Sequence, residues 1–457
     1  MRSAKKGAWT SWVAKYTAHT YNGPMSTQYA DTDNKSQPGS PMQPPEPEAA
    51  ATEPAPAESR WALLRRGRFL ALWAGQLTSV IGDTFNYVAV AWLVLQLTGS
   101  ALAVGSVLTT AAVPRALLML LGGAVNDRLS PRLTMALSGL LRAVVMGTLA
   151  ALALAHAVTL PELFIGSFLI GANSAFFIPA PPALLPRVVE QHQLEAGNAM
   201  MQLNSALGAI VGPALAGIVV AAFGAGAALL GDAGGYALAG VFALLVPGIV
   251  TTATTPKKGS PLASIGEGIA FVWHDVPMRA AWVVIAVINL IILGALVVGL
   301  PVLAREHLHG PVSFGVIFTA LGLAATAGAV VAGSRKAPAR LGWLLLAGTA
   351  WLGLSVAVIA LAQTLPAVLV AVVAIGLAIG VLNTYLLSWV QRRVQPDMMG
   401  RVMSMVMLAG VGAEPIGLAA GGAIASRSLT LLFWLCAASI VAVAAASTMS
   451  RSVRQMS

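Results

Sequence analysis

The chain has 457 residues, of which 57% are hydrophobic and only 10% are charged, and its formal net charge is +10. A soluble globular domain carries about 25% charged residues, so this composition cannot cover a water-facing surface and excludes a soluble protein. The positive charge does not indicate nucleic-acid binding. The basic residues stand at the ends of long apolar runs, where a membrane explains them better.

Residues 1–60 differ in composition from the rest of the chain. They are rich in Pro, Ala, Glu, Gln, Ser and Thr and cannot bury an apolar core, which predicts a disordered tail. No long apolar region stands at the start, so a secretory signal peptide is not expected. Met25 is an alternative initiator by hypothesis, in which case residues 1–24 are not translated; N-terminal mass spectrometry decides this.

From Arg68 onwards the chain is a series of apolar runs. A helix needs about 20 apolar residues to cross the hydrocarbon core of a bilayer. A tight turn is expected at Thr98-Gly99-Ser100, because one helix through this point is too long for a single crossing. The runs predict twelve transmembrane helices at 69–97, 101–125, 133–156, 160–185, 196–222, 226–250, 280–303, 313–333, 341–362, 366–390, 401–424 and 429–449.

The basic residues predict the orientation of the spans. Of the 27 Lys and Arg residues, 23 lie before the first span, in alternate loops or in the tail after the last span. Loops rich in Lys and Arg remain in the cytoplasm. We therefore expect an inner (cell) membrane protein with both termini and the segment 251–279 in the cytoplasm.

The segment 251–279 divides the spans six and six. We expect an N-terminal half at 61–250, a C-terminal half at 280–450 and a short cytoplasmic tail at 451–457. The segment itself reads as a linker with a short amphipathic helix on the cytoplasmic face, since apolar residues alternate with polar ones after Ser260. A linker helix with no function of its own is the favoured interpretation.

An internal repeat relates the two halves. A constant offset of 202 residues aligns span 5 with span 11 through four pairs of similar residues: Glu195 with Asp397, Met201 with Met403, Gly208 with Gly410 and Pro213 with Pro415. Two six-span halves related in this way are the arrangement of many secondary transporters. The sequence thus predicts an all-α membrane protein with twelve transmembrane helices in two pseudo-symmetric six-helix halves.

Two motifs resemble those of a known family. The loop after span 2, GGAVNDRLSPRLTM, resembles the cytoplasmic signature of the major facilitator superfamily in Gly123, Asp127, Arg128 and Arg132, although Ser130-Pro131 replaces the usual Gly between the two Arg positions. Span 5 is similar to the antiporter motif in Gly208, Gly212, Pro213 and Gly217. Shorter runs, among them Gly82-Asp83, residues 176–186, Asp232-Ala233, residues 267–273 and Gly400-Arg401, resemble the macrolide-efflux and siderophore-exporter branch of drug:proton antiporters.

The resemblance implies roles for both motifs. Asp127 would face the start of span 11 near Gly400 and Arg401, and this contact would hold the halves together while the cavity opens outward. The alternative is that these charges only set the topology. A bend at Pro213 would control leak and support exchange, although close packing of small residues explains the same pattern.

Five ionisable residues are expected to be buried within the spans, where a charge is costly and therefore faces the protein interior or water. Asp83 is our first candidate for a proton carrier and Glu414 the second. Asp232 lies near the outer end of its span, so a capping role explains it equally well. Arg115 and Arg142 are candidate counter-ions for these acids.

Polar and aromatic residues within spans are candidates for lining a substrate cavity. For each of them, helix packing through side-chain hydrogen bonds is at least as good an explanation as substrate contact. The candidates are Asn86, Tyr87, Asn173, Asn289, Asn383 and Tyr385.

The sequence lacks an ATP-binding loop of the G-x-x-x-x-G-K-[ST] type, so transport coupled to an ion or substrate gradient is expected. We expect no enzyme activity, cofactor or metal, and a monomer whose partners are protons, a small molecule and the bilayer. The leading hypothesis is a proton-coupled exporter of hydrophobic or amphipathic small molecules. A siderophore exporter and a non-transporting receptor or lipid-handling protein remain open, and neighbouring genes would separate them.

Overall fold

The computed structural model describes residues 60–128, 130–246, 270–308, 310–336, 338 and 340–449. In these residues it contains helices and turns and no strand. Ten helical stretches are long and apolar enough to cross a membrane, so the chain is an all-helical, multi-pass membrane protein. Residues 1–59 of the predicted tail 1–60, most of the linker 251–279 and the end 450–457 lie outside the described residues.

The first six predicted spans form the N-terminal half. After a short 3-10 turn, the helices follow the apolar runs closely, and three of them, α4, α5 and α6, have a Pro at the first or second position, where its missing N–H is not needed. Their bounds are η1 Arg60–Arg65, α2 Gly67–Thr98, α3 Ala101–Arg128, α4 Pro131–Leu154, α5 Leu160–Phe177, α6 Ala180–Val188, η2 Gln191–Gln193 and α7 Leu194–Leu245.

Helix α7 holds two predicted spans, which meet at a sharp turn at Gly224. Gly224 has φ of +83°, a conformation that costs glycine little. The expected turn between the first two spans is confirmed in the same way: Gly99 has φ of +67° and its N–H bonds to the Leu95 carbonyl. In both places the chain reverses at a left-handed glycine.

The C-terminal half contains the other six spans. Its helices are α9 Val276–Leu293, the π-helical turn η3 Gly294–Gly299, α10 Leu300–His307, α11 Pro311–Gly333, α12 Leu341–Leu361, α13 Leu365–Arg393, α14 Pro396–Val411, α15 Glu414–Ala425 and α16 Leu429–Met449. The eleventh span is divided between α14 and α15 at residues 412–413, so neither piece is long enough to count as a membrane helix by length. With this span and the two in α7, the ten long stretches account for twelve crossings.

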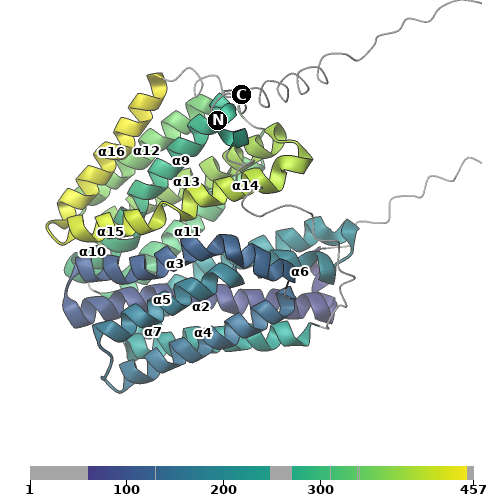
Figure 1. Ribbon diagram of the computed structural model, residues 1–457. Helices are drawn as coiled ribbons and strands as arrows, with labels where there is room; N and C mark the ends of the chain where they lie inside the picture. Colours follow the sequence, from purple (N-terminus) through teal and green to yellow (C-terminus); the bar gives the residue numbers. More distant parts are fainter. Residues whose placement is uncertain are drawn as a thin grey trace, which may run out of the picture. The chain divides into compact units, whose positions relative to one another are not determined.

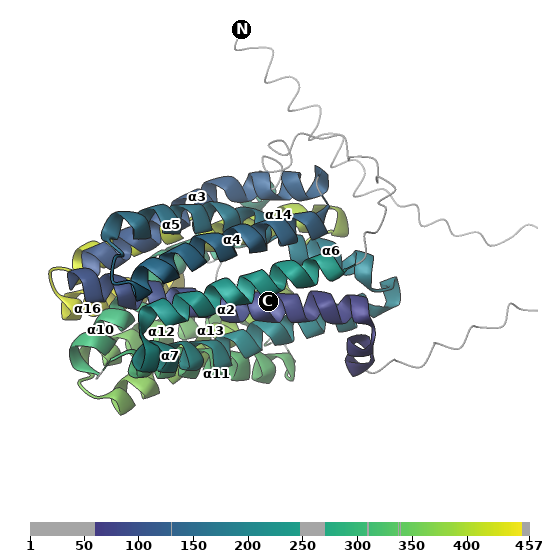
Figure 2. The same ribbon diagram turned by 90° about the horizontal axis from the view of Figure 1, so that it is seen from below.

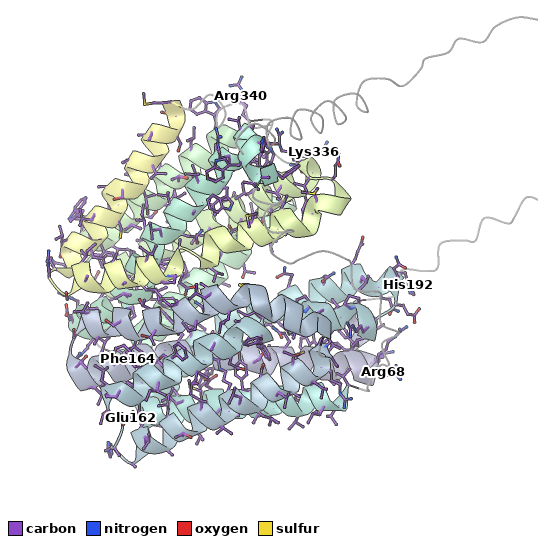
Figure 3. All side chains as sticks on the ribbon, viewed as in Figure 1. Arg68, Glu162, Phe164, His192, Lys336 and Arg340 are labelled. Atoms are coloured by element: carbon purple, nitrogen blue, oxygen red, sulfur yellow. The ribbon has the colours of Figure 1, made fainter. Side chains whose placement is uncertain are left out.

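Figure 1 shows α9, α12, α13 and α16 grouped in one half and α2, α4, α5 and α7 in the other. Figure 2 shows the second group again, running alongside one another. Figure 3 places Arg68 and His192 at one end of these helices and Glu162 and Phe164 at the opposite end. We call the end with Arg68, where the basic loops lie, the basic end, and the other the far end.

The same contacts recur in the two halves. The indole of Trp73 on α2 donates to the Met200 carbonyl at 3.0 Å, and Trp282 on α9 donates to the Met405 carbonyl at 2.7 Å. Each bond joins the first helix of a half to the fifth. This matched pair supports the internal repeat that the sequence predicts.

An ion pair also ties the first helix of each half to the end of the fourth. Arg66, just before α2, contacts Glu190 at 2.9 Å, and Arg393 at the end of α13 contacts Asp275 at 2.7 Å. In the N-terminal half the base stands at the first helix and the acid at the end of the fourth, and in the C-terminal half this order is reversed. The two connected positions are equivalent in the two halves. Both pairs lie at the basic end.

Candidate functional site

The polar centre of the N-terminal half is a cluster of four ionisable side chains from three helices, Asp83 on α2, Arg142 on α4, and Asp232 and Tyr236 on α7. The Arg142 guanidinium lies 2.7 Å from Oδ1 of Asp83 and 3.4 Å from Oδ1 of Asp232. It also donates to the Tyr236 hydroxyl at 3.0 Å, and its Cζ lies 3.9 Å from the centre of the tyrosine ring. One guanidinium therefore serves two carboxylates and an aromatic face.

The tyrosine completes the cluster. Its hydroxyl donates to Oδ1 of Asp83 at 3.0 Å while it accepts from Arg142, so it bridges the two charged groups. Tyr236 is not among the site residues that the sequence predicts. Its signal was its position four residues after Asp232, which puts both side chains on one face of the helix.

Glycines let the three helices approach closely at this level. A Cβ on Gly82 would lie 2.9 Å from Oδ1 of Asp232, and a Cβ on Gly139 of α4 would lie 2.8 Å from the Tyr236 carbonyl. Any larger residue at Gly82 would separate the Asp232 carboxylate from α2. The Gly82-Asp83 pair is thus required both for the charge and for the space beside it.

The two carboxylates differ in their access to solvent. The Asp83 side chain is 52% exposed, whereas those of Asp232 and Arg142 are 0% and 4% exposed. Oδ2 of Asp232 and Nε of Arg142 are buried with no hydrogen-bond partner in the described structure. A carboxylate so exposed in a membrane protein must face water, so the cluster joins a water-accessible acid to a buried one through a single cation.

A second ion pair connects the two halves. Arg115 of α3 contacts Glu414, the first residue of α15, and both side chains are about one-quarter exposed. The hydroxyl of Thr109, nearly two turns earlier on α3, donates to the Pro415 carbonyl at 3.4 Å. The helix break at 412–413 places Glu414 at the start of a new helix. A carboxylate is favourable there, although the internal repeat does not predict one at this position.

Above this pair, towards the far end, α3 and α15 meet backbone to backbone. A Cβ on Gly105 would lie 2.7 Å from the Leu418 carbonyl and 2.8 Å from Cα of Gly422. On the other side of the bundle a Cβ on Gly217 of α7 would lie 3.1 Å from Cα of Gly315 of α11. The described contacts between the halves thus include two glycine pairs near the far end.

The antiporter-like run of span 5 lies between two partners. Gly208 and Gly212 face α2, where an added Cβ would collide with Val80 and with the hydroxyl of Thr84, directly beside Asp83. The Pro213 carbonyl and Gly217 face Gly315 of the other half. The backbone stays helical through Pro213, so the predicted kink there stays a prediction, and the run connects the polar cluster to the interface between the halves.

The basic-end motif is only partly described. Gly123, Asp127, Arg128, Gly400 and Arg401 lie in helices, but their side chains are outside the described structure, so the predicted latch stays a prediction.

Arg132 is described. It donates to the carbonyls of Ala243 and Leu244 at 3.3 and 2.5 Å, at the last turn of α7. A cation there satisfies carbonyls that have no partner within their own helix. This contact lies within the N-terminal half and does not reach α14.

The predicted cavity-lining residues separate into groups. Asn173 donates to the Ser138 carbonyl at 2.9 Å, which joins α5 to α4, and the hydroxyl of Tyr87 donates to the Val297 carbonyl at 2.9 Å, which joins α2 to η3. Asn86 is half-buried on α2, and Tyr385 is buried in α13. Asn289 and Asn383 line one pocket in the C-terminal half.

Comparison with known proteins places the chain in a family. Residues 72–413 match the model of the Major Facilitator Superfamily. The chain is 27% identical over 377 residues to the multidrug efflux pump Tap of Mycolicibacterium fortuitum, covering 80% of this chain and 90% of that protein. It is 26% identical over 365 residues to Tap of Mycobacterium tuberculosis, covering 78% and 86%.

Solved structures share the fold at low sequence identity. The nucleoside transporter NupG superposes with a TM-score of 0.69 at 13% identity, covering 84% of this chain and 98% of that one. The POT family transporter PepTSo gives a TM-score of 0.66 at 13% identity, covering 86% and 99%. The family match, the relatives and the fold agree, and the chain belongs to the Major Facilitator Superfamily of membrane transporters.

Proposed function

We propose that this transporter exports amphipathic or hydrophobic small molecules from the cell in exchange for protons. The observation that carries the proposal is the cluster around Arg142, in which two carboxylates face one guanidinium. The cluster is neutral overall when one of the two carboxyl groups carries a proton. In a membrane interior a neutral cluster costs far less than a charged one.

The geometry supports a coupling between the charge states of the two carboxyl groups. Asp83 has access to water and Asp232 has none, and the Arg142 guanidinium lies within hydrogen-bond distance of both, while Tyr236 bonds to Asp83 and Arg142. Loss or gain of a proton changes the attraction that draws α2, α4 and α7 together. Gly208 and Gly212, in the first span of α7, pack on α2 beside Asp83, and the same span contacts α11 at Gly315, so a movement of α2 is passed to the interface between the halves.

The direction of transport follows from the charge pattern and the relatives. We propose that the basic end is cytoplasmic in the cell membrane. The contacts between the halves near the far end then correspond to a state closed to the outside. Two relatives carry the name multidrug efflux pump, which favours drugs over siderophores as the exported molecules.

Transport into inverted membrane vesicles tests the proposal. A susceptibility screen of a deletion strain and an overexpressing strain first selects a transported compound, and its uptake is then measured with and without an imposed pH gradient. The wild type should accumulate the compound only with the gradient. Asp83→Asn and Asp232→Asn should lose gradient-driven accumulation and keep downhill equilibration, because each fixes one carboxyl position in a neutral form.

Glu195→Gln is the matched control, since this acid is exposed on the first turn of α7, well away from the cluster. It should accumulate the compound like the wild type. Gradient-independent accumulation by the wild type, or unchanged gradient-driven accumulation in both Asp variants, contradicts the proposal.

A further inference from the structure

The C-terminal half encloses an apolar pocket that the transport proposal does not use. It lies among α9, α12, α13 and α16 and has a volume of about 140 Å³. Most of its lining is aliphatic, and its polar side chains are Asn289, Thr349, Asn383 and Ser447. Two of these are already satisfied in their own helices, since Asn289 donates to the Ile285 carbonyl and Thr349 to the Leu345 carbonyl.

A groove on the outside of the half borders this pocket. It runs between α9 and α16 along Val283, Val287 and Val443 and has a volume of about 590 Å³. Val284 and Ser447 line both the groove and the pocket, so the two hollows are neighbours. The groove faces outward between two membrane-spanning helices, where the surroundings are lipid.

The mouth of the groove is amphipathic. Trp273 is 50% exposed there and packs edge-on against Trp282, with ring centres 6.2 Å apart. Trp282 is itself fixed by its bond to the Met405 carbonyl. Indole rings favour the boundary between hydrocarbon and lipid headgroups, so this end of the groove marks the headgroup level.

Arg279 also lines the mouth and has no carboxylate within ion-pair distance in the described structure. The acid one turn before it, Asp275, is engaged by Arg393 at 2.7 and 3.3 Å. The guanidinium makes a single long bond, 3.4 Å, to the Trp273 carbonyl. A cation beside an apolar groove at headgroup level is complementary to a lipid phosphate.

The size of the inner pocket favours a lipid chain over a drug. Pockets for drug-sized ligands have volumes of about 300–1,000 Å³. An apolar cavity of about 150 Å³ takes a single small hydrocarbon group such as benzene. The groove, at about 590 Å³, has room for either ligand, so the inner pocket decides between them: it suits the end of an acyl chain, and the groove suits the rest of that chain.

We infer that the α9–α16 groove binds one anionic phospholipid, with its phosphate on Arg279 beside Trp273 and one acyl chain running past Val284 into the inner pocket. The inference does not depend on proton coupling or on the identity of the exported compound. It predicts that this transporter retains a specific lipid through purification.

Native mass spectrometry of the purified, delipidated protein tests the inference. The protein is titrated with phosphatidylglycerol and with phosphatidylcholine that has the same acyl chains, and the number of bound lipids is counted. The wild type should retain one phosphatidylglycerol at concentrations where phosphatidylcholine is lost. Arg279→Gln should weaken phosphatidylglycerol binding roughly fivefold, the effect of one basic residue near an anionic headgroup.

Ser447→Phe should block the opening between groove and pocket and remove the retained lipid of either type. Two variants serve as matched controls. Arg340→Gln removes another basic-end cation, and Thr448→Phe adds the same ring at the next position of α16, which lines neither hollow. Both should bind lipid like the wild type, and a thermal melt of each variant checks that it is folded.

Three results would overturn the inference. The first is equal binding of the two lipids by the wild type. The second is identical behaviour of each test variant and its control. The third is displacement of the retained lipid by a transported drug at stoichiometric concentration, which would make the groove a substrate site.

Discussion

The interiors of the two halves share a framework and differ in their charges. In the N-terminal half, α2, α4 and α7 enclose Asp83, Arg142 and Asp232 in one cluster. In the C-terminal half the corresponding space holds an aliphatic pocket with amides and hydroxyls. Between its ends the described C-terminal half has one charged side chain, Glu414, and that residue faces Arg115 of the other half.

This difference indicates that the repeat accounts for the shared helical framework, whereas the buried charged cluster occurs in the N-terminal half alone among the described residues. The indole bonds of Trp73 and Trp282 recur in both halves, because they hold the first helix of each against the fifth. A buried ion cluster is expensive and need occur only once for one proton to be exchanged. We therefore propose that the exchanged proton binds in the N-terminal half.

The largest expected effect on stability follows the removal of Arg142, the cation that Asp83 and Asp232 share. Arg142→Ala leaves two carboxylates without a counter-ion, and removal of one partner of a buried ion pair costs about 3–5 kcal/mol. The midpoint of thermal unfolding in detergent should fall strongly. The triple variant Arg142→Met, Asp83→Asn, Asp232→Asn should regain stability but should not regain gradient-driven transport. An unchanged unfolding midpoint in Arg142→Ala would contradict the proposed difference between the two interiors.

The contribution of the Arg115–Glu414 ion pair to transport can be measured by exchanging the two charges. Arg115→Glu and Glu414→Arg each place like charges together, so each should slow transport, whereas the double variant restores an attractive pair. Directly interacting residues usually couple by about 0.5–3 kcal/mol in such a cycle. Transport rates of the four proteins give the coupling, and additive effects would show that the pair does not control the interface.

The contact between α7 and α2 should be sensitive to a single methyl group. A Cβ at Gly212 would collide with the hydroxyl of Thr84, and overpacking costs about 1–3 kcal/mol. Gly212→Ala should lower the unfolding midpoint, and Thr84→Ala in the same chain should recover part of the loss. Gly234→Ala in the second span of α7, where nothing lies within 4 Å of the added Cβ, is the control and should not lower the midpoint.

The smallest effect is expected in the C-terminal interior. Asn383 lines the pocket and its side chain is exposed there, so Asn383→Leu removes no buried partner of a charge. Substitutions of this kind usually change stability by less than about 0.5 kcal/mol. A loss comparable to that of Arg142→Ala, measured in the same thermal assay, would erase the distinction between the two interiors.

Much of the fold could be predicted because a membrane span has a fixed length. The apolar runs alone give the helices to within a few residues, and the turns at Gly99 and Gly224 lie where the runs are interrupted. The break at 412–413 was not predicted. Its signal is Pro415 at the second position of α15, where a Pro begins a helix more readily than it continues one.

The pairing of the charged residues could be predicted only in part. Because a charged side chain is costly in hydrocarbon, the sequence indicates that five residues avoid lipid: Asp83, Asp232, Arg142, Arg115 and Glu414. It does not indicate which acid pairs with which base. Asp232 shows this limit, since its position near the end of a span suggested a cap, whereas its side chain is fully buried against Arg142. The tilt and rotation of three helices decide that contact, and one sequence does not contain them.

Proton release on drug binding tests the central claim most directly. The purified transporter is placed in weakly buffered solution with a pH indicator, and a transported compound from the susceptibility screen is added. The account predicts that the wild type releases protons on binding and that Asp83→Asn and Asp232→Asn release none while still binding the compound. Equal release from the wild type and both variants would contradict the assignment of the exchanged proton to this cluster.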